Sequence, residues 1–364
     1  MKRVLINAYT KDNLGDDLFI KVLCDRYPNT EFILYAPSSY RKTFKDLKNL
    51  SIFPNDSFIV RLINSILFRI FNIKGYFLNR LSKKSDASVL IGGSLFMEVG
   101  NWQFTMKKIE SMRYKDNPFF LLGANFGPYS DINFKAKHEK MFRGFTDISF
   151  RDKYSYDLFK HLGNVRVASD IIFNLKKGKM DLRKDNNVVI SVIKPSVRKS
   201  LNVSDNTYYE KIRDIAVYFL KNDYKVTLMS FCEPEGDKEA IENIERLIPE
   251  RYLSGISKHM YKSNIKETLD VIANSSYVVA TRFHAMILGW VYNIPVYPII
   301  YSEKMTNVIN DAGFKGKYSN IETINTLKPK EVFDSMNRNV INVSDLVIDS
   351  ERHFEKLDNY LSQN

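Results

Sequence analysis

The sequence predicts an α/β protein built from two doubly wound domains with a cleft between them. Apolar runs rich in Val, Ile and Phe alternate with longer stretches of helical periodicity, the pattern of parallel strands joined by crossover helices. Residues 174–187, "NLKKGKMDLRKDNN", are polar and lack this periodicity, and a second alternating set follows them. A chain of 364 residues is long enough for two such domains.

The first domain is expected to cover residues 1–176 and to contain a parallel sheet with helices on both faces. Its strands are expected at residues 3–9, 31–36, 87–92, 118–125, 147–151 and 165–168. Its helices are expected near residues 15–27, 58–81, 103–113, 132–144 and 153–162. Because ligands of such sheets bind at the carboxyl ends of the strands, those ends are where we look for functional residues.

The second domain is expected to cover residues 185–344. Its strands are expected at residues 188–193, 225–231, 277–281 and 295–300, with helices between and after them. The last segment, residues 345–364, contains the helical pattern "LVIDSERHFEKLDNYL" and is expected to pack back on the first domain.

The composition is basic and nearly free of cysteine. Lys and Arg number 54 against 42 Asp and Glu, a net charge of +12, which suits nucleic acid, anionic lipid or an anionic substrate. Cys24 and Cys232 belong to no Cys/His cluster, so we expect no metal site and a reducing, cytoplasmic location. The start "MKRVLINAY" enters a strand directly and shows no signal peptide.

Residues 58–81 form the most apolar stretch of the chain, but charged residues interrupt it, so no membrane span is expected. The basic residues are Arg61, Arg69, Lys74 and Arg80, and no acid lies between Asp56 and Asp86. One interpretation is a helix packed on the sheet with its basic residues in solvent. The other is an interfacial helix that lies on anionic lipid.

The loop after the first strand, "TKDNLGDDLF" at residues 10–19, offers Asn13, Gly15, Asp16 and Asp17. Gly15 allows a tight turn, and the helix start that follows can receive an anion. Helix capping by Asn13 or Asp16 is the alternative. The loop is not a nucleotide-binding fingerprint.

Two further strand ends of the first domain carry candidate residues. Gly92 and Gly93 end an apolar strand and allow a ligand or a second backbone to approach, and Glu98 follows them. A tight turn would explain the two glycines equally well. Arg151 precedes Asp152 at the end of another strand. Arg151 is either ion-paired within the fold or reaches a carboxylate or phosphate in the cleft, which a guanidinium can bind through two oxygens.

The second domain contains the most specific stretch, "ATRFHAMILGW" at residues 280–290. Thr281 is expected to cap the helix that follows, and Arg282 and His284 stand at its start. Helix N-termini disfavour cations, so this pair makes sense if an anionic ligand binds there. The alternative is a core histidine whose hydrogen bonds are satisfied, next to a surface arginine. Lys304, after the next strand, could add a charge for phosphate, or it is an exposed first-turn lysine. The other histidines, His138, His161, His259 and His353, are expected at the surface.

Together these segments resemble the polysaccharide pyruvyl transferase family. The resemblance runs from Asn13 to Met305 through "NLGDDL", "IGGSLFME", "GANFGP", "FRDKYSYDL", "SDIIF" and "ATRFHAMILGWVYNIPVYPIIYSEK", in that order. It departs at Ser94, Glu98 and Phe283, where the family usually has Gly, Asp and Leu.

The resemblance implies a GT-B-like fold with two Rossmann-type domains. It also implies an enzyme that moves a pyruvyl group from phosphoenolpyruvate to sugar hydroxyls and leaves a ketal on a cell-surface glycan, such as an exopolysaccharide, or on its lipid-linked precursor. Arg282 and His284 then fall on the catalytic, donor-binding Arg-x-His motif, and Arg151 falls on a second donor-binding arginine.

The residue types fit this chemistry without a redox or metal cofactor. Two arginines and a helix start suit the carboxylate and phosphate of phosphoenolpyruvate, and His284 can transfer a proton near neutral pH. The acceptor side would be formed by Asn13, Gly15, Asp16, Asp17, Gly92, Gly93 and Glu98. The base for the sugar hydroxyl could be Asp16, Asp17 or Glu98.

Two other functions stay open at the level of sequence. One is a glycosyltransferase of the same fold that uses a nucleotide sugar. The other is a non-catalytic binder of anionic lipid or nucleic acid. Because the basic residues are spread out except around residues 61–84, we do not expect nucleic acid. Residues 58–84 could instead bring the protein to the inner face of the plasma membrane.

Overall fold

The computed structural model describes residues 1–115, 117–177, 186–198 and 200–363, so the predicted linker lies partly outside the described residues. The chain forms two compact units. Unit 1 contains Met1–Thr10, Asp16–Asn174 and Leu346–Asn364, and unit 2 contains Lys11–Gly15 and Leu175–Asp345. Both ends of the chain therefore belong to unit 1, and the short segment Lys11–Gly15 groups with unit 2.

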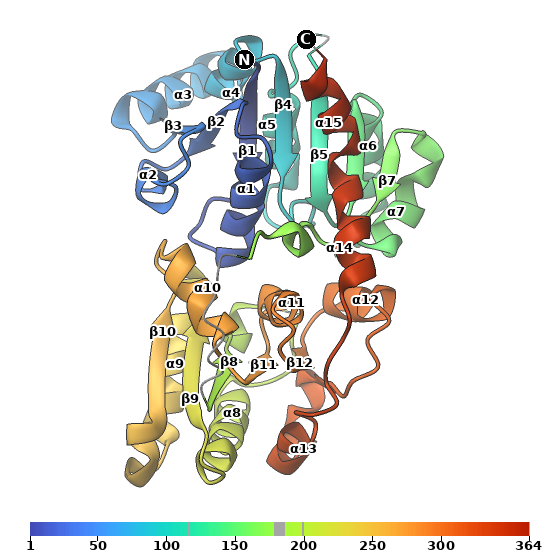
Figure 1. The fold of residues 1–364 in the computed structure, drawn as a ribbon. Helices are drawn as coiled ribbons and strands as arrows, with labels where there is room; N and C mark the ends of the chain where they lie inside the picture. The colour runs from blue at the N-terminus through green and yellow to red at the C-terminus, as the bar shows by residue number, and fades with distance from the viewer. Residues whose placement is uncertain (116, 178–185, 199, 364) are drawn as a thin grey trace. The chain divides into compact units, whose positions relative to one another are not determined.

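Unit 1 is built on a seven-stranded parallel sheet (Figure 1). Its strands, in spatial order, are β3 (Leu50–Pro54), β2 (Glu31–Ala36), β1 (Arg3–Ala8), β4 (Ala87–Ile91), β5 (Phe119–Ala124), β6 (Asp147–Phe150) and β7 (Val165–Val167). The winding reverses between β1 and β4, which pair from Val4–Ala87 to Ala8–Ile91. This reversal is the topological switch point of the sheet.

Helices cover both faces of the unit 1 sheet. They are α1 (Leu14–Arg26), α2 (Tyr40–Thr43), α3 (Phe58–Phe71), α4 (Tyr76–Lys83), α5 (Trp102–Glu110), α6 (Ile132–Phe142), α7 (Lys153–Phe159), α14 (Ser344–Glu351) and α15 (Glu355–Ser362), with short 3₁₀ turns at Lys160–Leu162, Ile171–Asn174 and Arg352–Phe354. Phe119 and Leu121 join a core with Phe142 of α6, whereas Phe120 points to the other face, 5.9 Å from the Tyr360 ring of α15. Successive residues of a strand alternate between faces, so β5 needs helices on both.

Unit 2 repeats the same winding with six parallel strands. Their order is β10 (Ile256–Met260), β9 (Lys225–Ser230), β8 (Asn187–Ser191), β11 (Tyr277–Ala280), β12 (Val296–Ile300) and β13 (Ser319–Asn320). The helices are α8 (Asp205–Leu220), α9 (Asp237–Leu247), α10 (Ile265–Ala273), α11 (Phe283–Val291), α12 (Glu303–Asp311) and α13 (Pro329–Asp334), with 3₁₀ turns at Pro195–Val197, Glu233–Glu235, Glu250–Gly255 and Ile321–Thr326. The switch point lies between β8 and β11.

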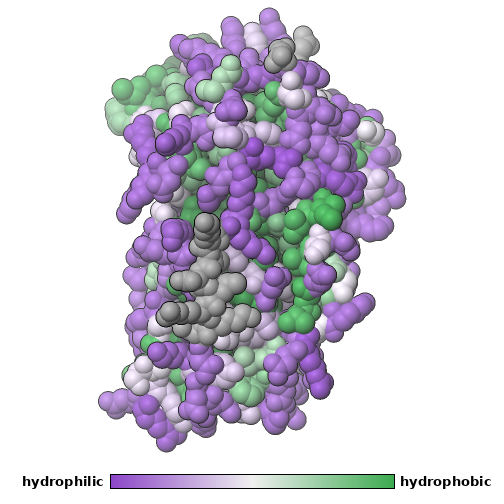
Figure 2. All heavy atoms as spheres, viewed as in Figure 1, coloured by the Kyte–Doolittle hydropathy of each residue, from purple (hydrophilic) through white to green (hydrophobic). Residues whose placement is uncertain are grey.

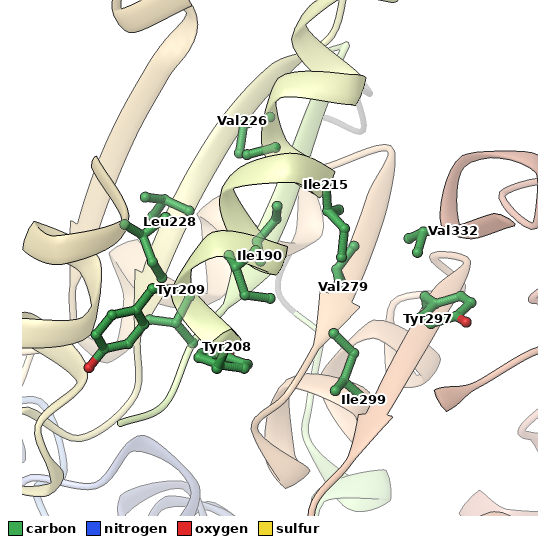
Figure 3. Close-up of a cluster of buried hydrophobic side chains, with 14 of the residues drawn as sticks. Ile190, Tyr208, Tyr209, Ile215, Val226, Leu228, Val279, Tyr297, Ile299 and Val332 are labelled. Atoms are coloured by element: carbon green, nitrogen blue, oxygen red, sulfur yellow. The ribbon is translucent and has the colours of Figure 1, made fainter. Parts of the chain in front are cut away.

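The core of unit 2 lies between the sheet and helices α8, α9 and α13. Figure 3 shows Ile190, Val226, Val279 and Ile299, which come from four strands, in one cluster with Ile215 of α8. On the opposite face α11 lies close to the sheet, because Gly289 has no side chain. A Cβ there would lie 2.4 Å from Val296 Cγ2.

The structure confirms every predicted strand and the two-domain α/β class, with differences at edges and helix breaks. Strands β3, β10 and β13 were not predicted. All three are at or near a sheet edge, and only two residues form β13. The predicted helix over residues 58–81 is two helices, because Asn72 and Gly75 adopt the left-handed conformation between α3 and α4. The predicted C-terminal helix is also divided, by the 3₁₀ turn at Arg352–Phe354.

Two histidines expected at the surface are buried. His138 of α6 packs among aromatic rings, with Nδ1 2.7 Å from the Phe134 carbonyl oxygen. His353 is fully buried within unit 1, where Nδ1 lies 2.7 Å from Ser149 Oγ and Nε2 lies 2.7 Å from the Ser169 carbonyl oxygen. His353 thus fixes the C-terminal segment against β6 and the end of β7. Burial lowers the pKa of His353 from its ordinary 6.5 to about 3.

We expect His353 to make the stability of unit 1 depend on pH. The unfolded chain binds a proton on this residue below about pH 6.5, whereas the folded chain does so only near pH 3, so stability falls as pH decreases between these values. The free energy of unfolding should fall by about 2 kcal/mol between pH 7.5 and pH 5. Urea unfolding at several pH values measures it.

In His353→Gln this dependence should become shallower, whereas His161→Gln, at an exposed position, serves as the control. Equal slopes in wild type and His353→Gln would contradict the assignment.

Candidate functional site

The turn from β11 to α11 lies at the switch point of the unit 2 sheet and is held by hydrogen bonds from its neighbours. The backbone N–H groups of Thr281 and Arg282 both donate to Ser191 Oγ at the end of β8, at 3.1 Å each. The Tyr208 hydroxyl donates to Thr281 Oγ1 at 2.9 Å. Thr281 therefore does not cap α11 as predicted. Arg282 occupies the N-cap position, with no capping bond from its side chain.

Arg282 is ion-paired inside unit 2. Its Nε donates to Asp237 Oδ2 at 3.0 Å, its Nη2 donates to Asp237 Oδ1, and its Nη1 donates to Glu235 at 2.5 Å. Asp237 Oδ2 also accepts the backbone N–H groups of Phe231 and Cys232, each at 2.9 Å. The Asp237 side chain is fully buried and that of Arg282 is 6% exposed. Both charges are therefore compensated within the fold.

The charges of this pair also act on Glu235. Burial alone would raise its pKa, but Arg282, Arg198 and Lys304 together outweigh burial and the pKa falls to about 2. Glu235 also accepts from Arg198 Nη2 at 2.8 Å. It therefore bridges two arginines that come from different loops.

The ring of Tyr301, at the end of β12, lies close to cationic side chains. The Arg198 guanidinium lies 4.8 Å from the centre of its ring, and Lys304 Nζ lies 5.9 Å from it. Lys304 Nζ is also 5.6 Å from the ring of Phe283, the residue between Arg282 and His284. Burial raises the pKa of Tyr301, but Lys304, Arg198 and Arg282 together outweigh burial, and the pKa is lowered.

We call this group of residues the β11 site: Arg198, Glu235, Asp237, Arg282, His284, Tyr301 and Lys304. It contains three permanent cations, Arg198, Arg282 and Lys304, against two carboxylates, so its charge balance is positive. The predicted residues Arg282, His284 and Lys304 are thus brought together. An anion can bind where positive charge is in excess.

The loop after β1 contacts His284 directly. A Cβ on Gly15 would lie 1.6 Å from His284 Nδ1, so any other residue at position 15 would collide with the imidazole. Asn13 Oδ1 accepts the Gly15 N–H at 3.0 Å, and Leu14 N donates to the Phe231 carbonyl at 3.1 Å. Asn13 therefore caps α1, and Gly15 is required by close approach. Both lie in unit 2, with the predicted donor residues Arg282, His284 and Lys304.

Arg151, in unit 1, is likewise ion-paired within the fold. Its Nη1 donates to Asp170 at 2.9 Å and its Nη2 to Asn125 Oδ1 at 2.7 Å, and its side chain is 2% exposed. A Cβ on Gly93 would lie 2.4 Å from Arg151 Nη2. The space that Gly93 leaves is therefore occupied by a guanidinium of the same unit.

The remaining predicted residues lie around the switch point of the unit 1 sheet. Asp16 and Asp17 are buried, and Asp16 Oδ1 lies 3.5 Å from where a Cβ on Gly92 would be. Glu98 accepts the backbone N–H groups of Ser130 at 2.5 Å and Asp131 at 2.9 Å. These bonds lower the pKa of Glu98 and tie two loops together. Glu98 is therefore less suited to act as a base than predicted.

The sequence interpretation missed the acids that orient Arg282. They lie in "FCEPEGDKEA", residues 231–240, directly after β9. Acidic residues at the carboxyl end of a strand were the available signal. No group of three or more His, Cys, Asp and Glu residues suited to a metal ion occurs among the described residues.

We expect Gly15→Ala to destabilise the protein through His284 alone. Replacing Gly by Ala in an unobstructed helix raises the free energy of unfolding by up to about 1 kcal/mol. Here the collision should lower it by about 1–3 kcal/mol. In the His284→Ala background the same change should be neutral or stabilising, and urea unfolding of the wild type, the two single variants and the double variant measures the coupling. An equal cost in both backgrounds would show that the imidazole is not the obstacle.

We expect Tyr301 to ionise below the ordinary tyrosine pKa of about 10. The difference in phenolate absorbance between wild type and Tyr301→Phe should show this titration, and Lys304→Ala should move it to higher pH. Tyr318→Phe, at a residue that is 46% exposed, is the control. If Lys304→Ala leaves the titration unchanged, the cation does not set this pKa.

The fold resembles that of several sugar-nucleotide proteins of known structure. They include the UDP-GlcNAc 2-epimerase from Neisseria meningitidis bound to UDP-GlcNAc (TM-score 0.62, 8% identity, 100% of each chain covered). They also include S. aureus MnaA in complex with UDP (TM-score 0.63, 14% identity, 100% of this chain and 98% of that chain covered). A third is the E. coli ADP-heptose LPS heptosyltransferase II, with a TM-score of 0.50 and 13% identity, covering 96% of this chain and 100% of that one. Identities this low show the GT-B-like fold alone.

The sequence also matches a family profile over most of its length. The profile describes polysaccharide pyruvyl transferases and aligns with residues 13–303, from the Gly15 loop through the Arg282–His284 turn to the start of α12. The chain belongs to the polysaccharide pyruvyl transferase family.

Proposed function

We propose that this protein transfers a pyruvyl group from phosphoenolpyruvate to two hydroxyls of a sugar and forms a ketal. The observation that carries the proposal is the positive balance of the β11 site at the start of α11, in a chain of this family. The acceptor would be a cell-surface glycan, such as an exopolysaccharide, or its lipid-linked precursor.

The β11 site offers groups that suit both anions of the donor. Lys304, Arg198 and His284 stand around the first turn of α11, whose free N–H groups also favour an anion. Arg282 has five N–H donors, three of which bind Asp237 and Glu235. We propose that these acids fix the plane of the guanidinium and that its other donors face the phosphoenolpyruvate.

The reaction balances without a redox or metal cofactor. One sugar hydroxyl proton reaches the methylene carbon, which becomes the methyl group. The other hydroxyl proton leaves with the phosphate, and two C–O bonds to the sugar replace the C–O bond to phosphate and the C=C bond. His284 is proposed to move a proton, and Asp16 or Asp17 to accept the first hydroxyl proton.

Arg151 is not available to the donor in the conformation that the structure shows. Its ion pair with Asp170 and its hydrogen bond to Asn125 occupy the guanidinium. A contact between Arg151 and the donor therefore requires that this buried pair open or share its donors.

A nucleotide-sugar glycosyltransferase is the second candidate. It is favoured by the neighbours of known structure that hold UDP or UDP-GlcNAc. The same cationic helix start would then hold a diphosphate. The two candidates differ in the donor that binds.

Calorimetry with phosphoenolpyruvate tests the proposal. Wild type should bind, and Lys304→Ala and His284→Gln should each weaken binding by about tenfold or more, because each removes one charged or polar contact. Lys315→Ala, at an exposed lysine of the same unit, should bind like wild type. Arg282→Ala is less suited to the test, because it would leave the buried Asp237 carboxylate without its ion-pair partner. The free energy of unfolding would then fall by about 3–5 kcal/mol.

Thermal unfolding of each variant, recorded alongside, separates lost binding from lost folding. A folded wild type that binds UDP-sugars and not phosphoenolpyruvate would replace the proposal with the second candidate.

A further inference from the structure

Helix α3 exposes most of its apolar side chains. Of its fourteen residues only Val60 is buried. Phe58, Leu62, Ile66 and Ile70 are 78%, 46%, 43% and 66% exposed. They follow at intervals of four residues, so they share one face of the helix. In Figure 2, which has the same view as Figure 1, apolar surface gathers at the upper left where α3 lies.

This helix is nevertheless well formed. Ser57 caps its start by accepting the Val60 N–H at 3.3 Å, and Asn72 ends it in the left-handed conformation. Phe68 packs edge-on against Phe104 of α5, with ring centres 6.0 Å apart. A surface helix of a globular protein normally turns its apolar stripe toward the core. An ordered helix that turns it outward marks an interaction surface.

All charged residues within α3 and α4 are basic, and the nearest acid along the chain, Asp56 before α3, lies close enough to Arg61 to interact with it. Arg61 and Arg69 of α3 are exposed, as are Arg80, Lys83 and Lys84 in and after α4. No Asp or Glu occurs between Asp56 and Asp86. The surface thus combines exposed aliphatic and aromatic side chains with arginines on the same helix.

We infer that α3 docks on an anionic lipid bilayer. We call the exposed Phe58, Ile59, Leu62, Ile66, Ile70 and Phe71, with Arg61 and Arg69, the α3 surface. Helices that lie in a membrane interface have this composition: apolar side chains enter the acyl boundary and basic side chains meet the anionic headgroups. Among the described residues no helix is long and apolar enough to cross a bilayer.

Two other occupants fit less well. A symmetric dimer through this face would bring the α3 surface against itself and oppose its like charges. Nucleic acid would use the arginines but leave Ile59, Ile66 and Ile70 without partners. The inference stands whether or not the protein transfers pyruvyl groups, since it concerns α3 alone.

Flotation with vesicles tests the inference. Wild type should float with phosphatidylglycerol–phosphatidylcholine vesicles and much less with phosphatidylcholine alone. Phe58→Ser/Ile66→Ser/Ile70→Ser should weaken binding by about tenfold or more. Arg61→Glu/Arg69→Glu should weaken it by at least about fivefold per charge and remove the preference for anionic lipid.

Matched controls come from exposed residues elsewhere. Ile132→Ser/Ile348→Ser replaces residues that are 73% and 70% exposed, and Lys221→Glu/Lys315→Glu changes charge by the same amount as the arginine variant. Both should float like wild type. The inference is overturned if folded wild type does not float with anionic vesicles, or if controls and α3 variants lose binding equally. It is also overturned if light scattering shows a dimer that the serine variant abolishes.

Discussion

The buried ion pair of Asp237 and Arg282 is the interaction on which the β11 site depends. One carboxylate accepts two N–H groups of the guanidinium and two backbone N–H groups from the end of β9. It therefore fixes three segments at once: the loop after β9, the start of α9 and the turn before α11. Removing either partner leaves an uncompensated charge in a low-dielectric interior, which costs far more than the loss of a surface pair.

This pair also explains how a cation can stand at a helix N-terminus. The partial positive charge of α11 disfavours Arg282, but Asp237 and Glu235 supply the compensating charge. Glu235 also accepts a hydrogen bond from Arg198, and this bond helps to position the Arg198 guanidinium over the Tyr301 ring. The cations that exceed the acids, and not Arg282 by itself, make the site attractive to an anion.

The sequence predicts the fold better than it predicts the partners within the site. Strands of the sheet centres carry continuous runs of Val, Ile and Phe, whereas edge strands such as β13 bury one face or less and carry a weaker signal. Arg282 and His284 stand out locally because helix starts rarely contain them. Asp237 lies 45 residues from Arg282, and the role of Gly15 depends on a still more distant imidazole. Contacts between residues so far apart along the chain leave no local pattern.

In residues 58–81 the sequence predicts helical structure but not which side of the helix is buried. Periodicity reveals that a helix has an apolar face, but the direction of that face is set by the rest of the fold. Within the stretch, α4 buries Leu78 and Ser82 while α3 buries Val60 alone. The break at Asn72 and Gly75 lets the two helices take different directions, so α4 satisfies the packed interpretation and α3 keeps its apolar residues in solvent. An exposed apolar surface of this kind marks an interaction site. The arginines on the same helix favour anionic lipid as the partner that we infer.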